Sequence, residues 1–227
     1  MSGRGRLGSA ALAWEVVMPE RRGSSFGGYK PQATLSWEQG GNVGSLRVPA
    51  CVGRRLEQMG EKEGFEPGSA GELEGYVRKL EARMASSRLA ELASRREVST
   101  KEAGERLRRE GFPPGVVAIA VGRAAECGLV DDARFADSFV RSKLACGWGA
   151  QRIERELSAR GIEASALEGW PYEYFDPAEE RSRALALASR KRLTGKNDYA
   201  KIVRFLVGRG FGMGVACDAA HQLLEEA

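Results

Sequence analysis

The sequence predicts a mainly α-helical protein: tandem repeats of three-helix units in an elongated curved array, preceded by a small β-containing segment at the N-terminal end. Three observations lead to this prediction. After residue 75 Arg, Glu, Ala and Leu dominate, and apolar residues recur every three or four positions. In the same part of the chain, three short segments share one pattern at nearly constant spacing. The glycine content also changes there, since 15 of the 29 glycines lie in residues 1–75.

The first 75 residues are predicted to bury little apolar surface. Residues 1–29 contain clusters such as 21–25 (RRGSS), so we expect a flexible tail with a short strand at residues 12–18. Residues 30–75 are expected to form a small β-hairpin-containing segment and a linker. Apolar runs at 33–37 and 43–48 flank a Gly-Gly-Asn turn and predict the hairpin. A short helix is expected at 50–59, and the glycines and prolines of 60–71 indicate the linker.

The repeated segments are residues 107–112 (LRREGF), 157–162 (LSARGI) and 206–211 (LVGRGF). Their glycines, Gly111, Gly161 and Gly210, are 50 and 49 residues apart. This spacing predicts three copies of one unit, at residues 76–130, 131–176 and 177–227. Each unit is too small to have a strong core alone, so stacking of neighbours predicts a long groove.

In each copy a helix of roughly eleven residues is expected to end at the shared glycine, which suits a left-handed C-terminal cap. Ser99, Gly149 and Asp198, twelve residues earlier, are expected N-caps. Apolar residues eight and four positions before the glycine form one stripe: Ala103, Leu107, Ile153, Leu157, Ile202 and Leu206. The preceding helices are expected at 83–96, 132–145 and 178–192, and the following ones at 114–126, 164–174 and 215–225. Asp131 and Asp132 are interpreted as helix caps rather than a catalytic carboxylate pair.

Several function classes lack the residues they need. His221 is the single histidine, so a Ser-His-Asp triad or a multi-histidine metal site would depend on it alone. The four cysteines form no CxxC pair, which favours free thiols in a cytoplasmic protein. Residues 23–28 have Walker A spacing, but Tyr29 stands where lysine is required. We therefore expect no enzyme, cofactor or metal, and no apolar run is long enough for a membrane helix.

The net charge of +4 belongs entirely to the chain after residue 75, which has 26 basic and 22 acidic residues. The helix faces opposite the apolar stripe carry a net charge of +5. These faces and the helix before the second one supply candidate contacts to acidic protein surface or DNA phosphate: Arg108, Arg109, Arg141, Lys143, Arg152, Arg155, Lys201 and Arg204. The alternative is a solvated face with ion pairs such as Arg152 with Glu156.

Two longer motifs make the pattern specific: residues 128–136 (GLVDDARFA), and residues 147–153 (GWGAQRI) followed by Glu156-Leu157 and Gly161-Ile162. Together with residues 107–112, they resemble the RecX family of bacterial regulators of the RecA recombinase, from about residue 82 to the C-terminus. The resemblance implies a non-enzymatic protein that binds the RecA nucleoprotein filament along its helical groove and restrains filament growth and recombinase activity. Regulation of DNA repair, recombination and the SOS response would follow, and we expect a monomer.

Trp148 stands where family members also carry a charged residue, so the resemblance assigns it no contact. A second hypothesis is an independent DNA-binding module that uses the basic faces. Steeply salt-dependent DNA binding without RecA would distinguish this module from the filament regulator.

Overall fold

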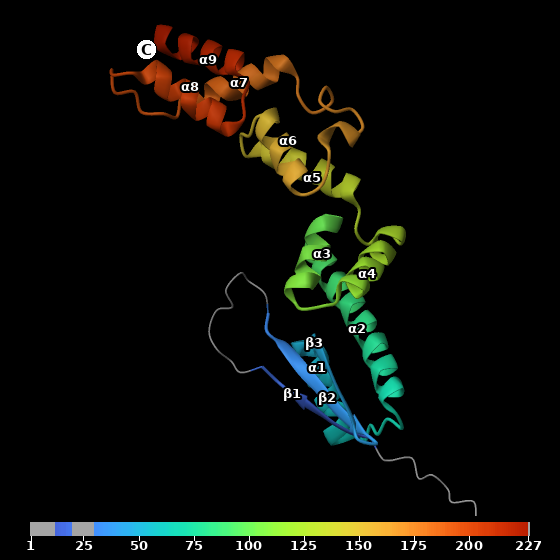
Figure 1. Ribbon diagram of the computed structural model, residues 1–227. Coiled ribbons are helices and arrows are strands. Elements are labelled where there is room, and N and C mark those ends of the chain that lie inside the picture. The colour runs from blue at the N-terminus through green and yellow to red at the C-terminus, as the bar shows by residue number, and fades with distance from the viewer. Residues whose placement is uncertain (1–11, 20–29, 227) are drawn as a thin grey trace, which may run out of the picture. The chain divides into compact units, whose positions relative to one another are not determined.

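The computed structural model describes residues 12–19 and 30–226, and it confirms the mainly helical class with a small N-terminal sheet (Figure 1). The rest of the expected tail, residues 1–11 and 20–29, lies outside the described residues. The chain forms two compact units. The first comprises Met1–Arg96 and Glu102–Val130, and the second comprises Glu97–Lys101 and Asp131–Ala227.

The sheet has three antiparallel strands in the order β1 (Ala13–Val17), β2 (Gln32–Gln39) and β3 (Asn42–Pro49). The expected hairpin is confirmed, with Gln39 opposite Asn42 across a two-residue turn. The short strand expected at 12–18 is also confirmed, because β1 pairs with β2 along its whole length. One face of the sheet packs against helix α1 (Ala50–Glu63), as Figure 1 shows.

The linker expected at residues 60–71 is wrong at both ends. Helix α1 continues to Glu63 because Met59 is still buried, and it ends on Gly64 in a left-handed conformation. Helix α2 (Ala70–Ala93) then begins 13 residues before the expected position. The hydroxyl of Ser69 accepts a hydrogen bond from the backbone N–H of Glu72 at 3.2 Å and caps this start. Burial of the apolar face of α2 offsets the low helix propensity of its glycines.

The three central helices are α3 (Thr100–Arg109), α6 (Ala150–Ala159) and α8 (Asp198–Arg209). Their predicted apolar stripe is buried in every copy. Gly111, Gly161 and Gly210 have φ angles of +91°, +78° and +93°, as the predicted left-handed cap requires. In each copy the next residue donates its backbone N–H to the leucine carbonyl five residues earlier, at 3.0–3.2 Å. This pattern is the Schellman motif, so the predicted C-terminal caps are confirmed.

The N-terminal ends of these helices agree with the prediction only in part. Gly149 is the N-cap of α6, as expected. Asp198 is not an N-cap, because Asn197 holds that position in α8. The Asp198 carboxylate instead accepts hydrogen bonds from the backbone N–H groups of Thr194 and Gly195, at 2.7 and 2.6 Å. It therefore stabilises the loop that precedes its helix.

The paired aspartates cap two different helices. Asp131 accepts hydrogen bonds from Ala133 N and Arg134 N, at 2.9 and 3.0 Å, and is the N-cap of α5 (Asp132–Ala145) as predicted. The Asp132 carboxylate accepts from Thr100 N at 2.8 Å and from Thr100 Oγ1 at 2.7 Å. It therefore satisfies an N–H group at the start of α3, a role that the sequence did not indicate.

The outer helices are α4 (Pro114–Glu126), α7 (Pro177–Ala188) and α9 (Met213–Glu225). The helix expected at 164–174 is wrong, since only the 3₁₀ turn η2 (Ala164–Ala166) forms there. Pro171 has no N–H to donate, and Gly169 adopts φ +76°, so a helix cannot continue. Leu167 and Phe175 are nevertheless buried and complete the core formed by α5 and α6, while α7, α8 and α9 enclose a separate core.

Candidate binding surface

The predicted contact residues fall into two groups, according to whether a carboxylate pairs with them. Three are paired: Arg109 with Glu105 at 3.5 Å, Arg141 with Asp137 at 3.0 Å and Lys201 with Asp198 at 3.2 Å. Within residues 12–19 and 30–226, the other five have no carboxylate at ion-pair distance: Arg108, Lys143, Arg152, Arg155 and Arg204. Ion pairs within the chain therefore neutralise only three of the eight predicted contact residues.

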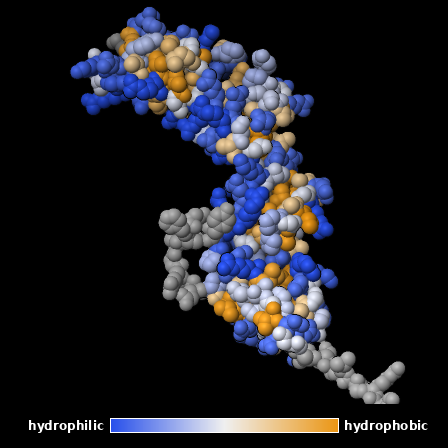
Figure 2. Space-filling view, in the orientation of Figure 1, coloured by the Kyte–Doolittle hydropathy of each residue, from blue (hydrophilic) through white to orange (hydrophobic). Residues whose placement is uncertain are grey.

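Four of these five cations belong to the second unit. Lys143 lies near the end of α5, Arg152 and Arg155 lie on α6, and Arg204 lies on α8. Arg155 and Arg204 are exposed, and hydrophilic side chains cover much of the visible surface around α6 and α8 (Figure 2). Arg108 is exposed in the last turn of α3, in the first unit.

An aromatic cluster holds two of the cations in place. The Arg152 guanidinium lies over the Trp148 ring, 3.8 Å from its centroid, and the Lys143 ammonium lies 5.0 Å from the same centroid. Phe139 packs edge-on against Trp148, and the Arg160 guanidinium lies over the Phe139 ring, 4.8 Å from its centroid. We call these five residues the Trp148 cluster. Cation–π contacts of this kind favour a defined orientation of the charged groups.

Trp148 is the functional candidate that sequence reasoning missed. Its signal was the spacing of cations around it, since Lys143 precedes it by five residues and Arg152 follows by four. Residues on one helix face are three or four apart, but Trp148 lies in the turn between α5 and α6. Only the fold shows that both cations reach its ring.

Arg141 belongs to a separate network. The Tyr174 hydroxyl donates to Asp137 Oδ1 at 2.9 Å, and Arg141 pairs with the same carboxylate. Hydrogen bonds from Arg141 and then Tyr174 lower the pKa of the Asp137 carboxyl. The Arg141 guanidinium also lies 5.6 Å from the Tyr174 ring centroid. Arg141 is therefore engaged inside the second repeat and contributes less to an unpaired basic surface.

The Phe205 ring of α8 also lies close to two cations. The Lys191 ammonium lies 4.2 Å from the Phe205 ring centroid, and the Arg209 guanidinium lies 5.4 Å from it. Lys201, by contrast, donates to Thr194 Oγ1 at 2.6 Å besides pairing with Asp198. Of the two predicted α8 contacts, only Arg204 is therefore unpaired within the described part of the chain.

The end of α8 fixes the start of α6. Gly149 N donates to the Arg209 carbonyl at 2.9 Å, and Gln151 N donates to the Gly210 carbonyl at 3.2 Å. A Cβ atom at Gly149 would lie closer than 3.0 Å to backbone atoms of Gly210. Backbone N–H groups at the start of α6 thus donate to carbonyl groups of the neighbouring repeat. These hydrogen bonds fix the position of the first turn of α6, which contains Arg152.

The end of α6 meets the start of α3 in a similar way. Lys101 Nζ donates to the Ala159 carbonyl at 2.9 Å, and Ser99 Oγ donates to the Arg160 carbonyl at 3.4 Å. The Lys101 ammonium therefore binds the carbonyl end of α6, although the sequence places this residue on the predicted basic face of α3. Within the second unit, these contacts join the end of α6 to residues 99–101.

The described residues contain no group of His, Cys, Asp and Glu side chains suited to a metal ion. Among the same residues, no helix is long and apolar enough to cross a membrane. The arrangement offers arginine and lysine groups on helices, which can bind carboxylate or phosphate oxygens.

Comparisons with known proteins identify the relatives of this chain. A family model of the second three-helix domain of RecX matches residues 131–168. The regulatory protein RecX of Chromohalobacter salexigens is 40% identical over 126 residues, which cover 53% of this chain and 80% of that protein. The chain belongs to the RecX family. The resemblance inferred from the repeat motifs is thereby confirmed.

More distant RecX proteins cover a larger share of the chain. The regulatory protein RecX of Caldanaerobacter subterraneus subsp. tengcongensis is 27% identical over 161 residues, which cover 71% of this chain and 81% of that protein. The crystal structure of RecX from Lactobacillus salivarius covers 65% of this chain and 98% of its own, with a TM-score of 0.54 and 20% identity. Another RecX crystal structure covers 91% of this chain and 96% of its own, with a TM-score of 0.55 and 17% identity. At these identities the solved structures show a shared RecX fold.

Proposed function

We propose that this RecX-family chain is a non-catalytic cytoplasmic regulator that binds the RecA nucleoprotein filament and restrains its recombinase activity. The observation that carries the proposal is a group of cations in the second unit that pair with no carboxylate within the described part of the chain: Lys143, Arg152, Arg155 and Arg204. Acidic side chains of a protein filament, or DNA phosphates within it, are the groups that such cations recognise.

The Trp148 cluster supports a binding role for Arg152 in particular. A free arginine side chain loses rotamer freedom on binding, at a cost of roughly 0.5–1.5 kcal/mol. Stacking on Trp148 restricts the Arg152 guanidinium before the partner arrives. The contact with a carboxylate or phosphate therefore needs less ordering.

The test compares RecA-dependent ATP hydrolysis and strand exchange on single-stranded DNA in the presence of two matched variants. The first variant reverses Arg152, Arg155 and Arg204 to Glu. The control makes the same charge change at three exposed arginines elsewhere, Arg54→Glu, Arg83→Glu and Arg181→Glu. We expect the first variant to need at least tenfold more protein for half-inhibition, while the control inhibits like the parent chain. Equal inhibition by both variants, with unchanged helical circular dichroism, would place the working surface elsewhere.

The sequence-based alternative, an independent nucleic-acid-binding module, draws support from the same cluster, because rings among cations are typical of single-strand binding surfaces. However, Trp148 is half-buried and its ring carries Arg152, which leaves it poorly placed for base stacking. We therefore expect weak binding to bare DNA. Tight binding without RecA, with an affinity that falls steeply with salt, would favour the alternative.

A further inference from the structure

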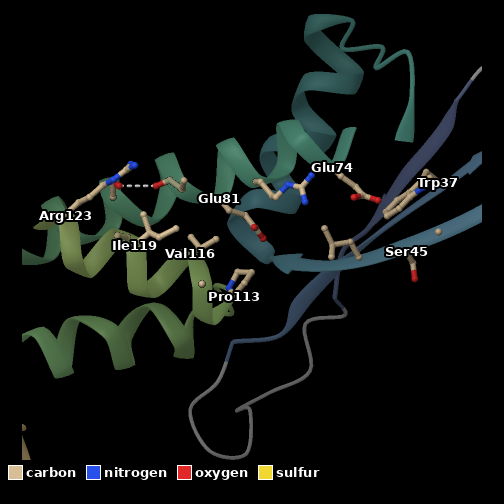
Figure 3. Close-up of a pocket in the computed structure, with 15 residues that line it drawn as sticks. Trp37, Ser45, Glu74, Glu81, Pro113, Val116, Ile119 and Arg123 are labelled. Carbon is tan, nitrogen blue, oxygen red and sulfur yellow. Dashed lines mark hydrogen bonds between the residues drawn. The ribbon is translucent and has the colours of Figure 1, made fainter. Parts of the chain in front are cut away.

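A cavity of the first unit has no role in the proposed function. It has a volume of about 660 Å³, within the range of peptide and small-molecule sites. It lies between β3 and helices α2 and α4, and Figure 3 shows its lining. Leu46, Val116 and Ile119 supply apolar walls, and Ile119 is 56% exposed. Hydrophobic residues also reach the visible surface over α4 and the sheet (Figure 2).

Glu81 lies in the wall of this cavity and points into it from α2 (Figure 3). The residue is 3% exposed, and its Oε1 atom has no hydrogen-bond partner among the described residues. Burial raises the pKa of its carboxyl to about 7. A buried carboxyl without a partner is costly, so a donor group brought into the cavity would gain a strong hydrogen bond.

Other charged groups line the cavity at more exposed positions. Glu74 and Arg78 come from α2 and Arg123 comes from α4, while β3 contributes no charged side chain. Arg78 and Arg123 are exposed, in contrast to Glu81. The deepest charged group is therefore acidic, which favours an occupant that carries a cation or an N–H donor.

The third wall of the cavity is the edge of the sheet. β3 pairs only with β2 within the described residues, so its other edge has backbone N–H and C=O groups outside the ladder. Gly44, Ser45 and Leu46 are consecutive on β3 and all line the cavity. Because successive strand residues face opposite sides of a sheet, a cavity lined by three in a row adjoins the strand edge itself.

We propose that this cavity is a docking site for an extended peptide segment that adds a strand to the β3 edge, inserts apolar side chains beside Leu46 and Ile119, and brings a lysine or arginine to Glu81. Backbone hydrogen bonds to the edge provide affinity, and alternate side chains in the cavity provide specificity. The aliphatic stem of a lysine or arginine suits the apolar wall, and its charged end suits the carboxyl.

The probe is a seven-residue peptide, acetyl-Thr-Leu-Thr-Lys-Thr-Leu-Thr-amide, titrated into the ¹⁵N-labelled full chain at pH 8. In an extended conformation its leucines and lysine share one side, which faces the cavity. We expect the peptide to change the NMR chemical shifts of the Gly44, Ser45 and Leu46 amides. A peptide with norleucine in place of lysine should bind roughly tenfold more weakly, the size of one charge-assisted hydrogen bond. A peptide with N-methylated backbone at alternate residues should lose the shifts.

Three variants, one of them a control, locate the binding of the peptide. Glu81→Gln keeps the side-chain volume, and it should reduce the difference between the lysine and norleucine peptides to less than threefold. Its matched control is Glu74→Gln, a less buried carboxylate of the same cavity, which should keep the difference near tenfold. Ile119→Arg changes an exposed residue at the cavity wall, so the chain should fold while binding of both peptides falls at least tenfold.

Three results would overturn the proposal. One is that millimolar lysine peptide causes no chemical-shift changes at the β3 amides, although the spectrum shows a folded chain. Another is that Glu81→Gln and Glu74→Gln change the affinity difference between the lysine and norleucine peptides equally. The third is the appearance of the β3 shifts when the protein alone is concentrated, which would assign the edge to a second copy of the chain.

Discussion

Replacing Gly149 with alanine tests the junction that holds α6 against the end of α8. Gly149 is the N-cap of α6, and its N–H donates to the Arg209 carbonyl at 2.9 Å. A Cβ atom there would come closer than 3.0 Å to three backbone atoms of Gly210 and Phe211. Backbone atoms cannot rotate away as a side chain can. The alanine variant must therefore separate the two helix ends.

The expected loss follows from two contributions. Overpacking a close contact costs about 1–3 kcal/mol. The two hydrogen bonds across the junction, from Gly149 N and Gln151 N, contribute about 0.5–1.5 kcal/mol each and weaken as the helix ends separate. We expect Gly149→Ala to lower the free energy of unfolding of the second unit by roughly 2–4 kcal/mol.

The measurement is urea unfolding followed by far-UV circular dichroism, with hydrogen exchange of the α6 amides as a local readout. Gly122→Ala is the matched control, because a Cβ atom at this α4 position meets nothing within 4 Å. Alanine is the better helix former, so the control should gain roughly 0.5–1 kcal/mol. A Gly149→Ala protein within 0.5 kcal/mol of the parent, or an equal loss in both variants, would refute this reasoning.

Three further predictions concern Glu81, Asp132 and Trp148. Because folding raises the pKa of Glu81 from 4.5 to about 7, stability should fall as pH rises between these values; Glu81→Gln should remove that slope and add roughly 2–3 kcal/mol at pH 8 in urea unfolding. Asp132→Ala removes the cap on Thr100 and should cost about 1–2 kcal/mol in the same assay, whereas Asp132→Asn should retain most of the stability. Trp148→Leu should raise the concentration for half-inhibition of RecA roughly fivefold by releasing Arg152, and Trp148→Phe should change it less. An unchanged value for Trp148→Leu would show that the stacking has no role.

Features that depend on local backbone geometry could be predicted from the sequence. The three repeat glycines stand at the end of an apolar stripe, and a left-handed residue followed by a large apolar one is a strong local signal. The hairpin turn at Gly40 and Gly41 is local in the same sense. The start of α2 differs from the prediction because the glycines and prolines of residues 60–71 indicate a linker, whereas in the structure Ser69 caps a helix that begins at Ala70.

The missing helix of the second repeat shows where the repeat pattern is misleading. Periodicity placed a helix at 164–174 by analogy with the other two copies, although Gly169 and Pro171 opposed it. Leu167 and Phe175 still fill the core, so the unit keeps its packing without the helix. Burial of apolar side chains, rather than a particular backbone conformation, is what the unit requires.

The sequence by itself determined the RecX-type repeat, its central helices and an excess of basic residues after residue 75, because each is a property of residue order and composition. Only the tertiary structure decided which of these cations pair with carboxylates and which contact aromatic rings. Asp198 accepts hydrogen bonds from the loop before its helix as well as pairing with Lys201, and the Trp148 ring contacts cations from the helices on both sides of its turn. Such pairings depend on directions in space between residues of different elements, and these directions are set by packing that no local pattern specifies.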